Sequence, residues 1–259
     1  MIDAHCHLDF PVFDEDRDEI MARAAAAGVR GFIVAGVQQA CWARQEALAK
    51  RYSNVRVALG IHPHVAARMS PQEIETSLME LDRRAEFAMG EMGLDGSRYC
   101  PRGSLPQQSE VFRAQLALAR THNLPVILHI LAAHGSAYDI LKRDGVPEAG
   151  GMVHSYSGSA EMVRNYQDLG LYISFSGSIT RSTARRALKA VASVDEERLL
   201  VESDCPDQRP EGRKGSRNLP EWLTDVVAAV AAVRNTSREQ VAETTAVNTC
   251  RLFGLKEWL

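Results

Sequence analysis

The hydrophobic pattern of the chain alternates between short apolar runs and longer segments with helical periodicity. The short runs are rich in Val, Ile, Leu and Phe, as is typical of strands buried on both faces of a parallel sheet. Eight such runs lie at 2–5, 31–37, 55–61, 87–91, 125–129, 151–154, 171–176 and 198–204. The segments between them predict helices near 15–27, 38–51, 70–84, 105–122, 134–144, 159–169, 180–192, 218–233 and 237–252. This alternation indicates an α/β protein built around a parallel sheet.

A single domain over residues 1–259 accounts for this pattern. A (β/α)8 or TIM barrel commonly occupies about 250 residues, and no proline- or serine-rich linker divides the chain. A doubly wound open sheet is the alternative, but that fold usually carries a glycine-rich dinucleotide-binding turn after its first strand. Here the first strand leads into His5, Cys6 and His7 instead. We therefore expect a TIM barrel.

Composition limits the kind of partner and the compartment. The formal net charge of −3 gives no overall basic field for holding long nucleic acids, so any such contact must be local. The five cysteines are scattered and show no C-x-x-C spacing, which favours reduced thiols. The first residues do not resemble a signal peptide, and the apolar helical run at 226–233 is too short to cross a bilayer. We expect a cytoplasmic protein without a membrane segment, plausibly a monomer.

Candidate metal ligands gather where the predicted strands end. His5 and His7 are two residues apart on an extended segment, so both rings leave the same face, although alone they are equally consistent with two structural histidines. Histidines or carboxylates also end the third, fourth, fifth, sixth and eighth runs, namely His62, His64, Glu91, Asp95, His129, His154, Glu202 and Asp204. In a barrel the carboxyl ends of the strands form one face, where catalytic residues collect. Crowded carboxylates and imidazoles at such a mouth call for a cation to compensate them.

The motifs at these strand ends resemble those of the TatD family of deoxyribonucleases. They recur in order along nearly the whole chain, as MIDAHCHLDF, ALGIHPH, GEMGLD, LPVILH, MVHSYSGS and LLVESDCP, followed by N-x-x-R-L-F at 248–253. The resemblance implies a barrel hydrolase with two divalent metal ions that acts on DNA ends. It implies that His5 and His7 hold one metal with Asp204 beside it, and that His129 and His154 hold the second.

The resemblance further implies that Glu91 bridges both metals and that His62 lines the mouth near the substrate. Two cations about 3.5–4 Å apart are suited to an in-line displacement, and a carboxylate is a natural bridge because it offers two oxygens. Asp204 would then take the proton of the attacking water. Histidine with carboxylate ligands suits Zn²⁺ and Mn²⁺ and, less well, Mg²⁺.

Two segments are candidates for binding the substrate phosphate. Ser155 opens a Ser-rich turn at 155–159 before a predicted helix, where hydroxyls and backbone N–H groups could face an anion. The loop after the eighth strand carries four basic residues, of which Arg213 and Lys214 are our first choices, although a solvated basic turn is an equal interpretation. The family usually has an arginine where this chain has Leu131, so one bidentate phosphate contact is missing.

Other polar residues receive more modest interpretations. We expect His122 and His134 to be surface or capping residues, Asp95 to orient a ligand, Asp3 to support the site or cap a turn, and Cys6 and Cys205 to lie outside it. Two other functions stay open at this point. One is an amide or ester hydrolase such as an aminoacyl-tRNA deacylase. It would use the same metals to hydrolyse aminoacyl-tRNA or a small ester. The other is a barrel kept as a binding scaffold, which the full ligand set disfavours.

Overall fold

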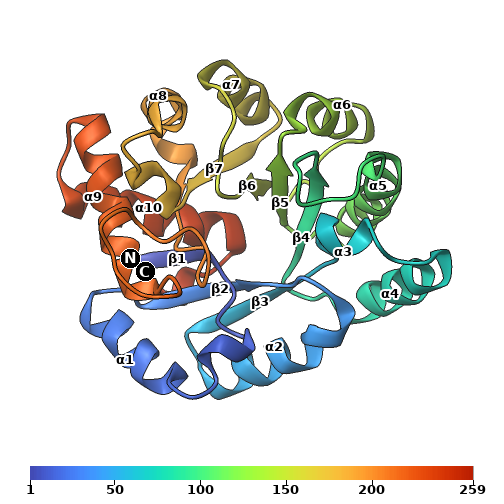
Figure 1. The fold of residues 1–259 in the computed structure, drawn as a ribbon, viewed down its shortest axis with the longest axis horizontal. Helices are drawn as coiled ribbons and strands as arrows, with labels where there is room; N and C mark the ends of the chain where they lie inside the picture. The colour runs from blue at the N-terminus through green and yellow to red at the C-terminus, as the bar shows by residue number, and fades with distance from the viewer. Residues whose placement is uncertain (259) are drawn as a thin grey trace.

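The protein is a ring of eight parallel strands with helices around it, as the computed structural model of the chain shows for residues 1–258 (Figure 1). The strands pair in sequence order, which confirms the predicted TIM barrel. They are β1 Ile2–Cys6, β2 Gly31–Ala35, β3 Val55–Leu59, β4 Ala88–Asp95, β5 Val126–Leu131, β6 Gly151–Val153, β7 Leu171–Phe175 and β8 Leu199–Val201. The ring closes just beyond β8, where the His7 N–H donates to the Cys205 carbonyl at 2.8 Å and the Asp204 N–H donates to the His5 carbonyl at 3.0 Å.

The helices lie close to the predicted ranges, except that the short helix at 63–66 was not predicted. They are α1 Arg17–Ala26, α2 Gln39–Arg51, α3 Pro63–Ala66, α4 Pro71–Arg84, α5 Leu105–Thr121, α6 His134–Asp144, α7 Ala160–Asp168, α8 Arg185–Ser193, α9 Leu223–Arg234 and α10 Arg238–Phe253. Short 3-10 turns occupy Pro11–Phe13, Gly177–Thr180, Glu196–Arg198, Pro220–Trp222 and Lys256–Trp258. Ser70 and Glu73 form the expected capping box at the start of α4. Within residues 1–258, no helix has the length and apolar character needed to span a membrane.

Apolar side chains fill the barrel from inside and cover it from outside. Alanines and Ile, Leu and Met side chains from the strands form the inner cluster, which also packs against α10. A second and larger cluster joins the outer faces of the strands to the surrounding helices. In β1, Ile2 and Ala4 belong to the inner cluster, whereas Cys6 belongs to the outer one. The pairing of β1 with β2 shifts register between Asp3 and Cys6, and such a bulge re-aims side chains, which lets His5 and His7 also point inward.

The structure departs from the predicted boundaries at two places near the barrel mouth. The strand predicted at 87–91 continues to Asp95, so Glu91 lies inside β4 rather than at its end. Gly93, at φ +141°, allows this, because a Cβ there would lie 2.1 Å from the His129 carbonyl oxygen. The helix predicted at 180–192 starts only at Arg185, because Glu211 accepts hydrogen bonds from the Ser182 N–H and hydroxyl and holds the preceding loop open.

Candidate metal centre

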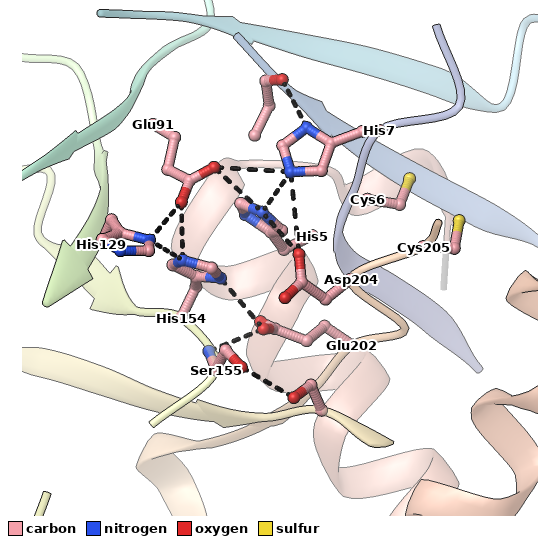
Figure 2. Close-up of polar contacts among 12 residues, drawn as sticks. His5, Cys6, His7, Glu91, His129, His154, Ser155, Glu202, Asp204 and Cys205 are labelled. Carbon is pink, nitrogen blue, oxygen red and sulfur yellow. Dashed lines mark hydrogen bonds and ion pairs between the residues drawn. The ribbon is translucent and has the colours of Figure 1, made fainter. Parts of the chain in front are cut away.

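The carboxylate of Glu91 lies at the centre of the site, between two groups of histidines (Figure 2). Its two oxygens face different neighbours. Oε2 faces His5 and His7 of the β1 segment, whereas Oε1 faces His129 of β5 and His154 after β6. The Glu91 side chain is only 3% exposed, so these contacts are made inside the barrel and not in open solvent. This arrangement is the one that a carboxylate shared by two cations would adopt.

The first cluster consists of His5 Nε2, His7 Nε2, Glu91 Oε2 and Asp204 Oδ1. His5 Nε2 lies 3.2 Å from His7 Nε2, 3.5 Å from Glu91 Oε2 and 3.4 Å from Asp204 Oδ1. His7 Nε2 lies 3.5 Å from Glu91 Oε2 and 3.7 Å from Asp204 Oδ1. Ligands bound tetrahedrally at 2.0–2.2 Å are separated from one another by about 3.3–3.6 Å. These five separations between donor atoms are therefore close to those of ligands around one cation.

The second cluster consists of Glu91 Oε1, His129 Nδ1 and His154 Nε2. Glu91 Oε1 lies 2.8 Å from His129 Nδ1 and 2.7 Å from His154 Nε2, and the two ring nitrogens are 3.1 Å apart. His62 approaches the same atoms, with its Nε2 at 3.2 Å from Glu91 Oε1 and 3.3 Å from His129 Nδ1. His62 also lines the cavity above the clusters. It is thus within ligand distance of the second cluster as well as at the mouth.

Contacts behind the rings decide which nitrogen of each histidine faces inward. His7 Nδ1 lies 3.2 Å from the Ala35 carbonyl oxygen, His129 Nε2 lies 3.2 Å from Asp95 Oδ2, and His154 Nδ1 lies 3.2 Å from Glu202 Oε1. Each of these oxygens accepts the ring N–H. The other nitrogen then faces Glu91, where it can offer its lone pair to a metal ion once it has lost its proton.

The carboxylates and histidines of the two clusters shift one another's pKa values toward the charged forms. Burial alone would raise the pKa of Glu91, but His154, His62 and His5 hold it well below its usual value. Burial alone would lower the pKa of His5, but Glu91 and Asp204 raise it to about 9. The pKa of His154 is likewise raised, by Glu91 and Glu202 against the effect of burial. The site therefore favours positive charge between its carboxylates, and a bound cation would displace the protons that the histidines otherwise hold.

A cavity of about 600 Å³ opens above both clusters. Phe10, Tyr99, Leu131 and Arg181 contribute to its walls in addition to the histidines and carboxylates. Tyr99, at the rim, is 59% exposed, so its ring is accessible from solvent. The site is therefore open to a substrate large enough to reach from the clusters to the aromatic rim.

Comparison with known proteins places the chain in a family. A family model described as TatD related DNase matches residues 2–254. The chain belongs to the TatD-related DNase family. The uncharacterized metal-dependent hydrolase YabD of Bacillus subtilis is 34% identical over 254 residues, which cover 98% of both chains. The 3′-5′ ssDNA/RNA exonuclease TatD of Klebsiella pneumoniae is 34% identical over 264 residues, with the same coverage of 98% for each chain.

The crystal structure of YjjV, a TatD homolog from Escherichia coli, has the same fold. It superposes with a TM-score of 0.90 at 34% identity and covers 98% of both chains. The chain is thus a TatD-family metal-dependent hydrolase, as its motifs predicted. The relatives with nuclease names do not favour the deacylase alternative.

The predicted phosphate-binding residues lie in different surroundings from those expected. The Ser155 N–H donates to Glu202 Oε1 at 2.6 Å, and its hydroxyl lies 2.8 Å from the Ser176 hydroxyl (Figure 2). Because the buried Glu202 carboxylate accepts the Ser155 N–H, that N–H is not free to bind an anion. Ser155 is also not among the residues that line the cavity. Arg213 forms an ion pair with Asp225 at 2.5 Å and lines a neighbouring cavity, not the one above the clusters. The exposed Lys214 is not part of the cavity wall either.

Several residues outside the two clusters have positions that explain their presence. The Asp3 carboxylate accepts hydrogen bonds from the Ser203 N–H and hydroxyl, which ties β1 to the segment after β8. The thiols of Cys6 and Cys205 adjoin each other away from the ligands (Figure 2), and burial together with the Cys205 thiol keeps the pKa of Cys6 well above its usual value. Both cysteines thus lie outside the site, as expected.

Three histidines lie outside the two clusters. His64 lines the cavity, and its Nε2 lies 2.5 Å from Asp95 Oδ2. His122 lies at the surface and pairs with Asp82 at 2.7 Å, as expected. His134 begins α6, but it is not a surface residue, because its Nδ1 lies 3.1 Å from the Tyr166 hydroxyl and its ring packs among tyrosines. Burial, followed by the charge of Arg186, lowers the pKa of His134 from 6.5 to about 4.

The sequence placed Glu202 among the possible metal ligands at the strand ends but did not predict its contact with His154, which it orients from a fully buried position. Its position one residue before Ser203 and two before Asp204, in the run that ends β8, was the available signal. Asp204 and Ser155 both have positive φ, of 57° and 41°, a conformation that few non-glycine residues adopt. No pattern in the sequence predicts those two backbone conformations.

Proposed function

We propose that this protein is a metal-dependent phosphodiesterase that removes nucleotides from the 3′ end of single-stranded DNA. The observation that carries the proposal is the sharing of the Glu91 carboxylate between two groups of potential metal-binding atoms. A two-cation centre of this kind suits displacement at phosphorus. The name of the Klebsiella relative, a 3′-5′ ssDNA/RNA exonuclease, supports a phosphodiester as the bond that is hydrolysed.

The residues of the two clusters would hold two divalent ions, either Zn²⁺, Mn²⁺ or Mg²⁺. His5, His7 and Asp204 would hold one, His129 and His154 the other, and Glu91 would bridge them. Nitrogen and carboxylate donors fit Zn²⁺ and Mn²⁺ better than Mg²⁺, which prefers oxygen. When bound, such ions would lower the pKa of a water molecule toward neutrality and offset the negative charge of the phosphate.

Asp204 would act as the general base. Its carboxylate lines the cavity, and the pKa of Asp204 is lowered, because His5, His154 and His7 outweigh the effect of burial. It is therefore in the ionised form that accepts a proton. His62 lines the same cavity and would contact the substrate next to the second cluster. A cytoplasmic location and a monomeric state stay predictions.

The test is the digestion of a short single-stranded DNA labelled at its 5′ end. We expect a ladder of labelled products that shorten from the 3′ end, and no ladder when the terminal 3′ linkages are phosphorothioates. His129→Gln should abolish it, whereas His122→Gln, which removes an exposed histidine paired with Asp82, should not. Failure of the wild-type, metal-loaded protein to release nucleotides, together with hydrolysis of a carboxylic ester, would overturn the proposal in favour of an esterase.

A further inference from the structure

Arg181 occupies the wall of the cavity above the metal centre. It follows the 3-10 turn Gly177–Thr180 after β7, in the loop that the Glu211 carboxylate holds away from α8. Among the described residues that line this cavity, it is the one with a permanent positive charge. The same lining contains the carboxylates of Glu91, Asp95, Asp204 and Asp207.

The guanidinium of Arg181 keeps most of its donors available. Its Nη2 donates to Gln208 Oε1 at 3.2 Å, and no carboxylate of residues 1–258 forms an ion pair with it. Arg213 and Arg217, on the neighbouring basic loop, are instead paired with Asp225 and Asp16. A guanidinium has five N–H groups, so an arginine held at one of them can still donate two parallel hydrogen bonds to a phosphate.

The charge balance of the cavity also favours an anion next to Arg181. Four carboxylates contribute −4, and two divalent ions, on the proposed function, contribute +4. With neutral histidines the sum is zero, and Arg181 brings it to +1. A phosphodiester carries −1, which matches the charge that Arg181 adds to the cavity lining.

Arg181 lies where this cavity meets a second one. Leu131, at the end of β5, lines the cavity at the position where the family motif usually has an arginine, and its side chain offers no donor. A second cavity, of about 520 Å³, adjoins the first and shares Arg181, Asp207 and Gln208 with it. Arg181 therefore lies at the junction that a phosphate chain leaving the metal centre would pass.

We infer that Arg181, oriented by Gln208, binds the substrate phosphate at the metal centre and determines the preference for a phosphodiester over a neutral substrate. The inference rests on the proposed function, because it assumes that the substrate is a phosphodiester. It assigns to the β7–α8 loop the role that sequence reasoning gave to Arg213 and Lys214. Arg181 is a substrate-binding residue in this account and takes no part in holding the metals.

The experiment compares Arg181→Gln with Arg164→Gln, a matched loss of an exposed arginine on α7. Two single-stranded DNA substrates are used, one with a phosphodiester and one with an uncharged methylphosphonate at the 3′-terminal linkage. Affinity is measured by fluorescence anisotropy, and KM and kcat by nucleotide release. Melting temperature and metal content check that each variant is folded and loaded.

We expect Arg181→Gln to weaken binding and raise KM for the phosphodiester by about 10- to 100-fold, as for the loss of a hydrogen bond to a charged group. It should leave methylphosphonate binding unchanged, reduce the salt dependence of log affinity by about 0.7, and be partly rescued in Arg181→Lys. If wild type releases nucleotides but Arg181→Gln matches Arg164→Gln on both substrates, the inference is wrong and the proposed function stands. If wild type releases none, the proposed function fails and the inference falls with it.

Discussion

Replacing Glu202 with glutamine tests whether the residues behind the ligands tune the metal centre. Glu202 is fully buried, and its Oε1 accepts hydrogen bonds from His154 Nδ1 at 3.2 Å and from the Ser155 N–H at 2.6 Å. The amide of Glu202→Gln still offers an oxygen to both donors but carries no charge. Changes of this kind behind a ligand typically cost about 10- to 100-fold in metal affinity, which corresponds to about 1.4–2.7 kcal/mol.

In Glu202→Gln, only the second cluster, which contains His154, should bind its metal ion more weakly. The assay is a titration of metal-free protein against a fluorescent chelator that competes for the ion. Glu80→Gln is the control, because it removes a half-buried carboxylate on α4 that pairs with Arg83. Activity should fall at limiting metal and recover at saturating metal, with the melting temperature of the loaded protein preserved. Equal metal affinity in Glu202→Gln and Glu80→Gln would refute the idea that Glu202 tunes His154.

Three further predictions follow from single residues. Asp204→Asn should lower turnover by about 10²- to 10⁴-fold with an unchanged circular dichroism spectrum, and near wild-type turnover would exclude Asp204 as the base. Tyr99→Ala should weaken single-stranded DNA binding by about 1–3 kcal/mol if a base stacks on this exposed ring, and unchanged anisotropy would rule stacking out. As the pH drops from about 6.5 to about 4, the unfolded chain takes up a proton at His134 but the folded state does not. The free energy of unfolding should therefore fall through that pH range, by at most about 3 kcal/mol. Urea unfolding across the range should show a weaker pH dependence for His134→Gln than for His122→Gln, and identical slopes would contradict the buried-histidine argument.

The barrel and the gathering of ligands were predictable because they depend on regular features of the sequence. Strand runs of four to seven apolar residues locate the elements, and the carboxyl ends of parallel strands must meet at one face. His5 and His7 needed only the alternation of a strand to share a side. The position of Glu91 inside a longer β4 was missed, because it depends on how closely Gly93 lets the backbone approach His129.

Substrate contacts were less predictable because loops present them. The pairing of Arg213 with Asp225 joins residues from a loop and a helix, and no local pattern indicates it. The capture of the Ser155 N–H by Glu202 likewise joins segments 47 residues apart. Arg181 was overlooked because the segment was interpreted as part of a helix, whereas a contact to Glu211 opens it into a loop. Sequence patterns report regular elements, and long-range polar contacts decide which loop side chains stay free.

The central claim, that Glu91 joins two metal-binding clusters into one hydrolytic centre, is tested most directly by titrating metal-free protein with Mn²⁺ or Zn²⁺ while following nucleotide release from single-stranded DNA. We predict no release without metal, and activity that rises until two ions are bound per chain. In Glu91→Gln, fewer than two ions should bind and release should be lost. Full activity in verified metal-free protein, or two tightly bound ions in Glu91→Gln, would contradict the account.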